Sequence, residues 1–119
     1  MRNFLFIWIF PFMFLATGCD PRDYDIVLRN TGSNTIKDAH VRYDNFQSIG
    51  GWVSPGNQKT HSRPGIPIPL TAIVEWKTED DTKFQTNMLI KQNLPKDFRG
   101  EIIFEIADSK VKMTYKQQW

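Results

Sequence analysis

Apolar and polar side chains alternate along most of the chain beyond residue 23, which is the period of β-strands that bury one face. The clearest case places Ile102, Phe104 and Ile106 on one face, with Glu101 and Glu105 on the other. No segment beyond residue 23 shows the longer period of an amphipathic helix, so an all-β domain is expected. The segments with the strand period are residues 24–29, 38–43, 50–53, 58–62, 72–77, 83–88, 101–106 and 110–116.

Turn-forming residues separate the predicted strands. Asparagine, glycine, serine and proline occupy most of residues 30–33 and 54–56. Three prolines within residues 63–70 exclude a helix or a central strand there, so a loop or an edge is expected. Residues 94–98 are the one predicted helical turn. This pattern predicts a small antiparallel immunoglobulin-like β-sandwich of seven or eight strands with Trp76 in its core, and a small open barrel is the alternative.

The first 18 residues have a different character. Arg2 precedes an uncharged apolar block, residues 4–16. A helix of that length spans about 20 Å, which is less than the hydrocarbon layer of about 30 Å. Pro11 lies inside the block, and a helix interior tolerates proline poorly. A short cationic region followed by such a block predicts a secretory signal peptide over residues 1–18.

The block closes with residues 15–19, Leu-Ala-Thr-Gly-Cys, which resemble the lipobox of bacterial lipoproteins. The resemblance implies that Cys19 receives a diacylglyceryl group, that the signal is cut just before it, and that the new N-terminus is acylated. The family prefers leucine three positions before the cysteine, where this chain has Ala16. Each buried methylene contributes about 0.8 kcal/mol, so two or three acyl chains anchor a protein durably.

Asp20 follows the predicted lipidation site. In enteric bacteria this lipoprotein family uses aspartate here as an inner-membrane retention signal. The resemblance therefore implies a protein anchored by lipid to the bacterial cell membrane, facing the periplasm, with the inner membrane favoured. Residues 19–23 then hold the lipidated cysteine and a short tether, and residues 24–119 form the sandwich domain.

The charge balance and the cysteine count limit the partners. The chain has 15 Lys and Arg against 13 Asp and Glu, and removal of Arg2 with the leader leaves 14 against 13. Nucleic-acid-binding domains usually carry a basic stripe, so nucleic acid is not an expected partner. A single cysteine excludes an intrachain disulfide and metal sites built from four cysteines.

Motifs of the common enzyme classes are missing from the sequence. It contains no Gly-x-Ser-x-Gly elbow, no His-Glu-x-x-His and no phosphate-binding glycine loop, so no enzyme, cofactor or small-molecule substrate is expected. His40 and His61, with Asp38 and Asp44, carry groups that can ligate a metal. The spacing of the two histidines matches no metal-binding motif, so solvated surface histidines and no metal site are expected.

Four residues are candidates for contact with a partner. Trp52 follows two glycines that leave it little cover, so it is either a partly buried rim residue or an exposed contact residue. Arg63, Ile66 and Ile68 lie in the proline segment. That segment is either a rigid recognition loop, whose ordering cost on binding is already reduced, or a crossover between strands.

Several short stretches carry a second resemblance: Phe46, Ser48, Ile49, Gly50 and Gly51, then Lys59-Thr60-His61, Pro67-Ile68-Pro69, Trp76-Lys77-Thr78 and Leu94-Pro95. They are similar to small lipoproteins encoded beside secreted antibacterial effectors. The resemblance implies an immunity protein that inhibits a periplasm-acting effector, such as a phospholipase, by direct protein binding. The alternative function is that of a structural accessory lipoprotein of a cell-envelope or secretion apparatus.

Overall fold

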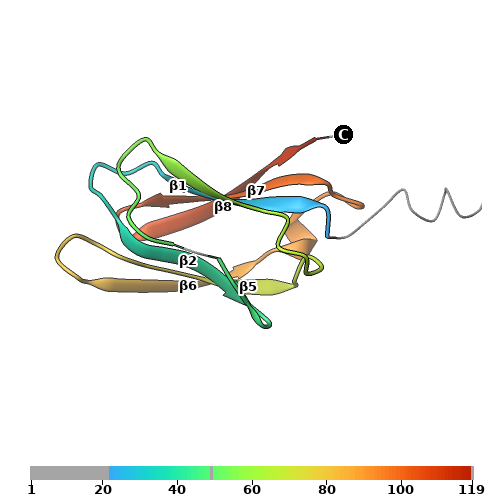
Figure 1. Ribbon diagram of the computed structural model, residues 1–119, viewed down its shortest axis with the longest axis horizontal. Coiled ribbons are helices and arrows are strands. Elements are labelled where there is room, and N and C mark those ends of the chain that lie inside the picture. Colours follow the sequence, from blue (N-terminus) through green and yellow to red (C-terminus); the bar gives the residue numbers. More distant parts are fainter. Residues whose placement is uncertain (1–21, 49, 119) are drawn as a thin grey trace, which may run out of the picture.

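The computed structural model describes residues 22–48 and 50–118, so the predicted leader, Cys19 and Asp20 lie outside the described residues. Within them no helix is long and apolar enough to cross a membrane. The described chain forms strands and a short 3₁₀ helix, η1 (Figure 1). Their bounds are β1 Tyr24–Asn30, β2 Lys37–Tyr43, β3 Phe46–Gln47, β4 Gln58–Ser62, β5 Thr71–Lys77, β6 Lys83–Leu89, η1 Lys91–Asn93, β7 Gly100–Ala107 and β8 Lys110–Gln117.

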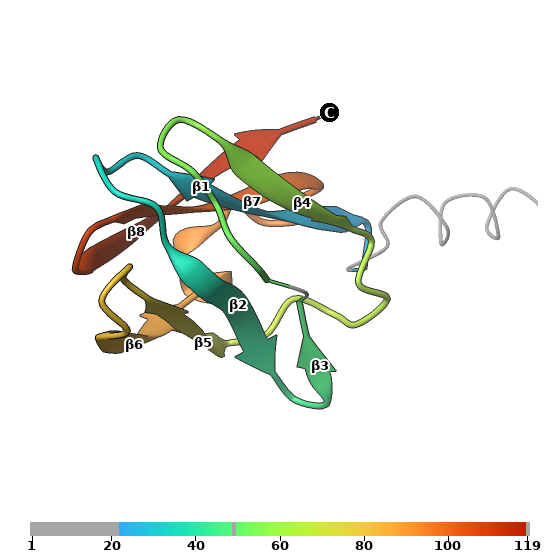
Figure 2. The same ribbon diagram turned by 60° about the vertical axis from the view of Figure 1, so that its left-hand side comes forward.

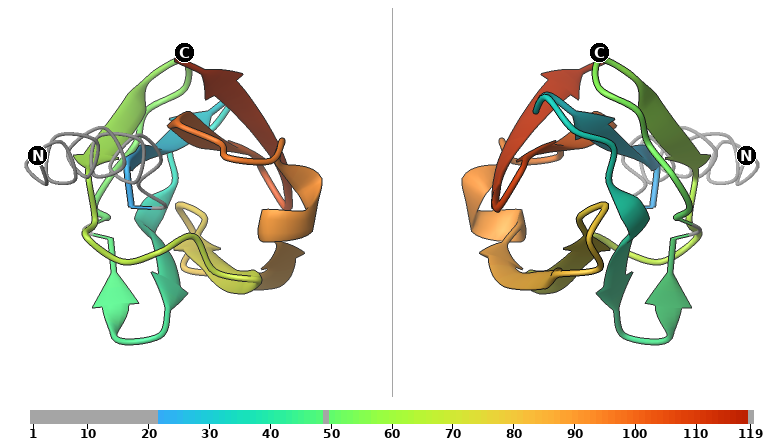
Figure 3. Two further views of the ribbon diagram at one scale, coloured as in Figure 1. Left: turned by 90° about the vertical axis from the view of Figure 1, so that its right-hand side faces the viewer. Right: turned by 90° about the vertical axis from the view of Figure 1, so that its left-hand side faces the viewer.

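The strands form two four-stranded sheets that pack face to face, which confirms the predicted β-sandwich (Figures 2 and 3). One sheet has the order β4-β1-β7-β8 and the other β3-β2-β5-β6. β1 and β7 run parallel, from Tyr24 opposite Gly100 to Asn30 opposite Ile106. This pair differs from the antiparallel expectation, whereas the other pairs of named strands are antiparallel. The reason is the crossover after β6, which returns the chain to the first sheet at the end where β1 begins.

The alternating apolar residues meet between the sheets. Trp76 on β5 is 1% exposed, as expected for a core residue. Its ring stacks on Phe84 with 5.6 Å between centroids, and its Nε1–H donates to the carbonyl oxygen of Asp108 at 2.8 Å. That hydrogen bond links β5 to the turn between β7 and β8. The other large core side chains include Tyr24, Ile26, Leu28, Ile36, Val41, Val74, Ile102, Phe104 and Ile106.

The two ends of the sandwich are named here after the ends of β1. At the Tyr24 end, the Tyr24 hydroxyl is hydrogen-bonded to that of Tyr43 and donates to the carbonyl oxygen of Ile66 at 2.8 Å. At the Asn30 end, the buried Asn30 amide donates to the carbonyl oxygens of Asn34 and Val53, both at 2.8 Å. These buried polar groups therefore tie the loops at each end to β1.

The predicted helical turn at residues 94–98 is wrong in position. The 3₁₀ helix lies just before it, at Lys91–Asn93, and Leu94 is extended with φ −112° and ψ 153°. Pro95 explains the difference, because a proline disfavours the helical conformation of the residue that precedes it.

Candidate functional site

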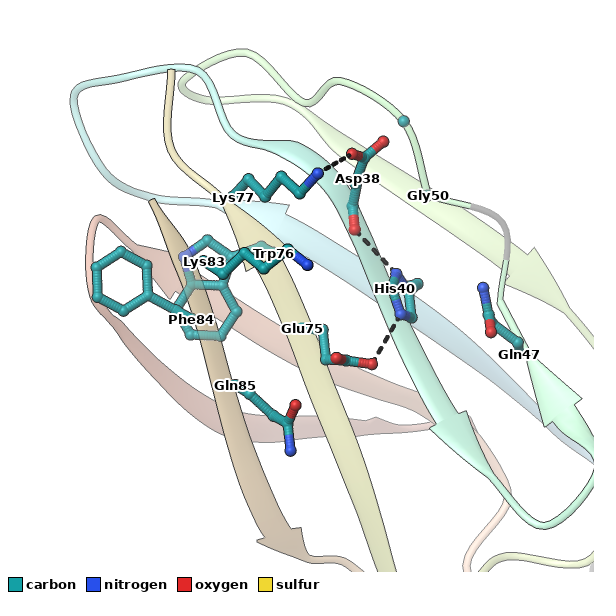
Figure 4. A pocket seen from close by; sticks show the side chains of 11 residues that line it. Asp38, His40, Gln47, Gly50, Glu75, Trp76, Lys77, Lys83, Phe84 and Gln85 are labelled. Carbon is teal, nitrogen blue, oxygen red and sulfur yellow. Dashed lines mark hydrogen bonds and ion pairs between the residues drawn. The ribbon is translucent and has the colours of Figure 1, made fainter. Parts of the chain in front are cut away.

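The outer face of the β3-β2-β5-β6 sheet carries a cluster of charged side chains. Register places His40 of β2 opposite Glu75 of β5, and His40 Nε2 lies 3.0 Å from Glu75 Oε1. Arg42 Nε donates to the same oxygen at 3.0 Å. His40 Nδ1 lies 2.9 Å from the carbonyl oxygen of Asp38 (Figure 4). Both ring nitrogens of His40 therefore lie within hydrogen-bond distance of an oxygen atom.

The electrostatics of this cluster favour an ionised Glu75. Burial raises the pKa of the Glu75 carboxyl, but the hydrogen bonds and charges of Arg42 and His40 outweigh burial and hold the pKa below its ordinary value. Within the described residues, no hydroxyl or thiol is hydrogen-bonded to His40, so this histidine has no attached nucleophile to activate. The arrangement is suited to ionic and hydrogen-bonding contact with a partner.

A hollow of about 420 Å³ adjoins the cluster on the same face (Figure 4). Lys77 crosses part of it to pair with Asp38, with 3.4 Å between Nζ and Oδ2. The lining is mostly polar, so the hollow is suited to the polar side chains of a partner. The lining residues are Asp38, His40, Gln47, Gly50, Gly51, Glu75, Trp76, Lys77, Lys83, Phe84 and Gln85.

Trp52 lies directly after Gly51 and is 68% exposed, which agrees with the exposed alternative of the two expected for it. The Lys37 ammonium lies over its ring, 5.8 Å from the centroid. Lys37 is itself held by Asp81, with 2.6 Å between Nζ and Oδ1. Lys37 therefore makes a cation–π contact with the exposed indole, and Asp81 holds Lys37 in place.

Two glycines explain how the chain brings Trp52 to this position. A Cβ on Gly50 would lie 1.7 Å from the carbonyl oxygen of Ala39, so only glycine allows the backbone to pass this close to β2. Gly51 has φ +116°, a conformation that side chains disfavour. The Gly50-Gly51 pair therefore has a structural role, and Trp52 projects beyond it.

The other three candidate contact residues lie at the opposite end of the molecule from Trp52. Trp52 precedes Val53, whose carbonyl oxygen accepts a hydrogen bond from the Asn30 amide at one end of β1. Arg63 follows β4 at the other end, with 3.7 Å between its Nη2 and Asp23 Oδ1. Ile66 and Ile68 are partly buried and pack against the core, and the Ile66 carbonyl accepts the Tyr24 hydroxyl. The structure therefore does not bring the four predicted residues together in one patch.

The two histidines also lie apart. His61 is on β4, in the other sheet from His40, and meets the ring of Phe46 edge-on at 4.9 Å. Within the described residues there is no group of three or more His, Cys, Asp or Glu that can hold a metal ion. Sequence reasoning missed the partners of His40 and Trp52, namely Glu75, Arg42 and Lys37. Alternation put His40 and Glu75 on polar faces, but nothing in the sequence showed that their strands are neighbours.

Comparison with known proteins gives a fold resemblance only. No protein-family model matches the chain, and no curated protein matches it. One solved structure, described as "NMR structure of the protein from Eubacterium rectale", is similar with a TM-score of 0.55 and 15% sequence identity. The similarity covers 82% of this chain and 91% of that one. At this identity the likeness supports the sandwich fold and carries no function.

Proposed function

We propose that the protein is a lipid-anchored, periplasm-facing binding module that acts by occupying the surface of another protein. The anchor is supported by the resemblance of residues 15–19 to a lipobox, and the inner membrane by Asp20. Tyr24 follows Cys19 by five positions, so an extended tether spans at most about 17 Å. A domain held this close to the bilayer meets its partners on surfaces remote from Tyr24.

The observation that carries the proposal is Trp52 at the Asn30 end. Its side chain is exposed and supported by Lys37, and it lies at the opposite end of β1 from the tether. Exposed tryptophans are enriched among residues that dominate binding energy. Because Asp81 already holds Lys37, little side-chain entropy is lost when a partner covers this pair.

The partner that the sequence supports best is a secreted antibacterial effector that acts in the periplasm, such as a phospholipase. The support is the resemblance of the short stretches between Phe46 and Pro95 to small immunity lipoproteins. An immunity protein needs no chemistry of its own, only a contact surface held where the effector arrives. The polar hollow beside Gly51 and the exposed Trp52 supply such a surface.

Binding of the purified full chain to the effector encoded beside its gene tests this function. We expect stoichiometric binding, and we expect Trp52→Ala to raise Kd by about 30-fold, or about 2 kcal/mol, because hot-spot tryptophans cost this much when truncated. The melting temperature should not change, since the side chain is exposed. Leu70→Ala is the matched control, because Leu70 is 66% exposed but lies beside β5 at the Tyr24 end.

Two results contradict the proposal in different ways. A fall in melting temperature that accompanies the loss of binding would make Trp52 a structural residue instead of a contact residue. If expression of the chain fails to protect cells from the neighbouring effector, or if the gene has no such neighbour, the accessory role in an envelope apparatus replaces the immunity role.

A further inference from the structure

The edge strands of the two sheets differ in how well they are protected against pairing. Natural edges are usually shortened, bulged or charged, because their unpaired backbone groups are a template for another strand. Among the described strands, β3 has two residues, β4 has five and includes Lys59, and β8 carries three lysines. β6 pairs with β5 without a register shift and is charged only at Lys83, its first residue. Residues 84–89 are therefore an uncharged, regular edge.

The hydrogen bonds that flank the β5–β6 ladder show which groups of β6 point outward. Ile90 N–H donates to Leu70 O at 2.8 Å beyond one end, and Thr78 N–H donates to Thr82 O at 3.0 Å beyond the other. Hydrogen-bonded pairs alternate with non-bonded pairs along an antiparallel ladder. The even-numbered residues of β6 therefore bond to β5, and the odd-numbered residues direct N–H and C=O to the open edge.

One of these outward groups already has a partner. The Asn93 amide of η1 donates to the carbonyl oxygen of Leu89 at 3.0 Å and so covers the end of the edge. Gln85 and Asn87, in the middle of β6, are both exposed. Their outward backbone groups are left for water or for another strand.

We propose that β6 pairs antiparallel with β6 of a second copy of this chain, about a two-fold axis at Thr86. Gln85 of each copy then lies opposite Asn87 of the other, and each such pair exchanges both backbone hydrogen bonds. Phe84 of each copy lies opposite Met88 of the other, so apolar side chains meet apolar ones. The edge is complementary to itself, with no charge opposite a like charge, which a two-fold interface requires.

The apolar surface between β6 and β8, next to this edge, also favours a second copy of the chain. A hollow of about 720 Å³ lies between β6 and β8, with apolar side chains contributed by both strands. Leu89 is 53% exposed and Tyr115 is 45% exposed there, so apolar surface continues beyond the edge itself. A second copy on β6 would extend the sheet over this side and reduce the exposed apolar area of both copies.

This pairing does not depend on the partner proposed above, but it has a consequence for an anchored protein. The two-fold axis of an antiparallel pair is perpendicular to the sheets, so the two Tyr24 ends point in opposite directions along the strands. Two tethers of about 17 Å reach one bilayer when the axis is perpendicular to the membrane. The sheet that contains β1 then lies nearer the lipid, and the outer face with His40 and Glu75 points away from it.

Cross-linking of Thr86→Cys in the full chain, in membranes under mild oxidation, tests the pairing. Thr86 faces its own mate in a non-hydrogen-bonded pair, whose Cα separation of about 4.5 Å lies within the range of disulfides. We expect a disulfide-linked species of twice the chain mass that reductant removes. Thr114→Cys is the matched control, because Thr114 is also a half-buried threonine in the middle of an edge strand, β8. The parent chain, with Cys19 alone, gives the background.

Gln85→Pro in the Thr86→Cys chain removes an outward N–H and leaves the ladder with β5 intact. The cross-link should be lost several-fold, while circular dichroism remains that of a β protein. Cross-linking of Thr86→Cys no greater than that of Thr114→Cys overturns the proposal. So does a cross-link that persists in Gln85→Pro, or sedimentation of the wild-type chain in detergent as a monomer at all concentrations.

Discussion

Single residues of this protein acquire their properties from neighbours that lie far away in the sequence. Alternation along β5 predicts Glu75 as an ordinary surface carboxylate, but hydrogen bonds and charges from Arg42 and His40 on β2 lower the pKa of its carboxyl. The Trp52 ring is contacted by the Lys37 ammonium, which is held by an ion pair with Asp81. Each of these contacts can be tested by changing one side chain.

The first such test concerns the pH dependence of stability at Glu75. Because folding lowers the pKa of this carboxyl, its stabilising effect is present above its ordinary value of 4.5 and is lost as pH falls through the lowered value. At pH 7 the melting temperature of the wild type should be higher than that of Glu75→Gln, and this difference should shrink toward pH 3. Thermal unfolding of both proteins across this range measures it.

Glu101→Gln provides the control for that experiment. Glu101 lies on β7 between Lys116 of β8 and Asp25 of β1, whereas Glu75 is hydrogen-bonded to both Arg42 and His40. The same substitution there should give a smaller difference between pH 7 and pH 3. A gap between wild type and Glu75→Gln that stays constant with pH would contradict the effect of Arg42 and His40 on Glu75.

At the scale of elements, strands that are joined by a short turn pair with each other, whereas the order of strands in each sheet is set by tertiary packing. The β7–β8 hairpin places Glu105 opposite Lys112, with 3.8 Å between Glu105 Oε1 and Lys112 Nζ. Such an exposed pair contributes little, about 0–1 kcal/mol. The stability of the strands comes instead from their buried faces, and Trp76 on β5 is the largest side chain buried there.

Trp76→Ala should therefore destabilise the domain severely. The change removes the stack on Phe84 and the hydrogen bond to Asp108, and it leaves a cavity between the sheets. Truncation of a buried aromatic costs about 3–5 kcal/mol, a large share of the roughly 5–15 kcal/mol that holds such a domain folded. Denaturant unfolding measures the loss, with the exposed Trp52→Ala as control. Wild-type stability of Trp76→Ala would contradict the core assignment.

At the scale of the whole molecule, the two ends of the sandwich have different surroundings. The chain enters at the Tyr24 end, where Asp23 is paired with Arg99 and Arg63. The Asn30 end carries Trp52. If the protein is anchored at Cys19, this difference becomes one between the end that carries the tether and the end that lies away from it.

Cys19→Ser tests the anchor. The substitution removes the thiol that receives the diacylglyceryl group, so metabolic labelling with a radioactive fatty acid should be lost. The protein should accumulate as an unprocessed precursor or in a soluble form. Asp20→Asn is the control, because it changes the sorting position and keeps the thiol, so labelling should persist. Labelling of Cys19→Ser at the wild-type level would refute the lipoprotein assignment.

The sequence by itself determined most of the strands, which face of each is buried and that Trp76 is a core residue. Those properties are local, because side chains alternate across a strand and turn residues act on their own backbone. The strand expected at residues 50–53 was wrong, because the structure has only an isolated bridge at Val53 there and a short strand, β3, at Phe46–Gln47. Alternation does not encode which strands are neighbours. Only the tertiary structure decided that β1 pairs in parallel with β7, that His40 meets Glu75, and that Trp52 lies away from Arg63. Such pairings depend on how whole sheets bury their apolar faces together, which a single-residue pattern cannot specify.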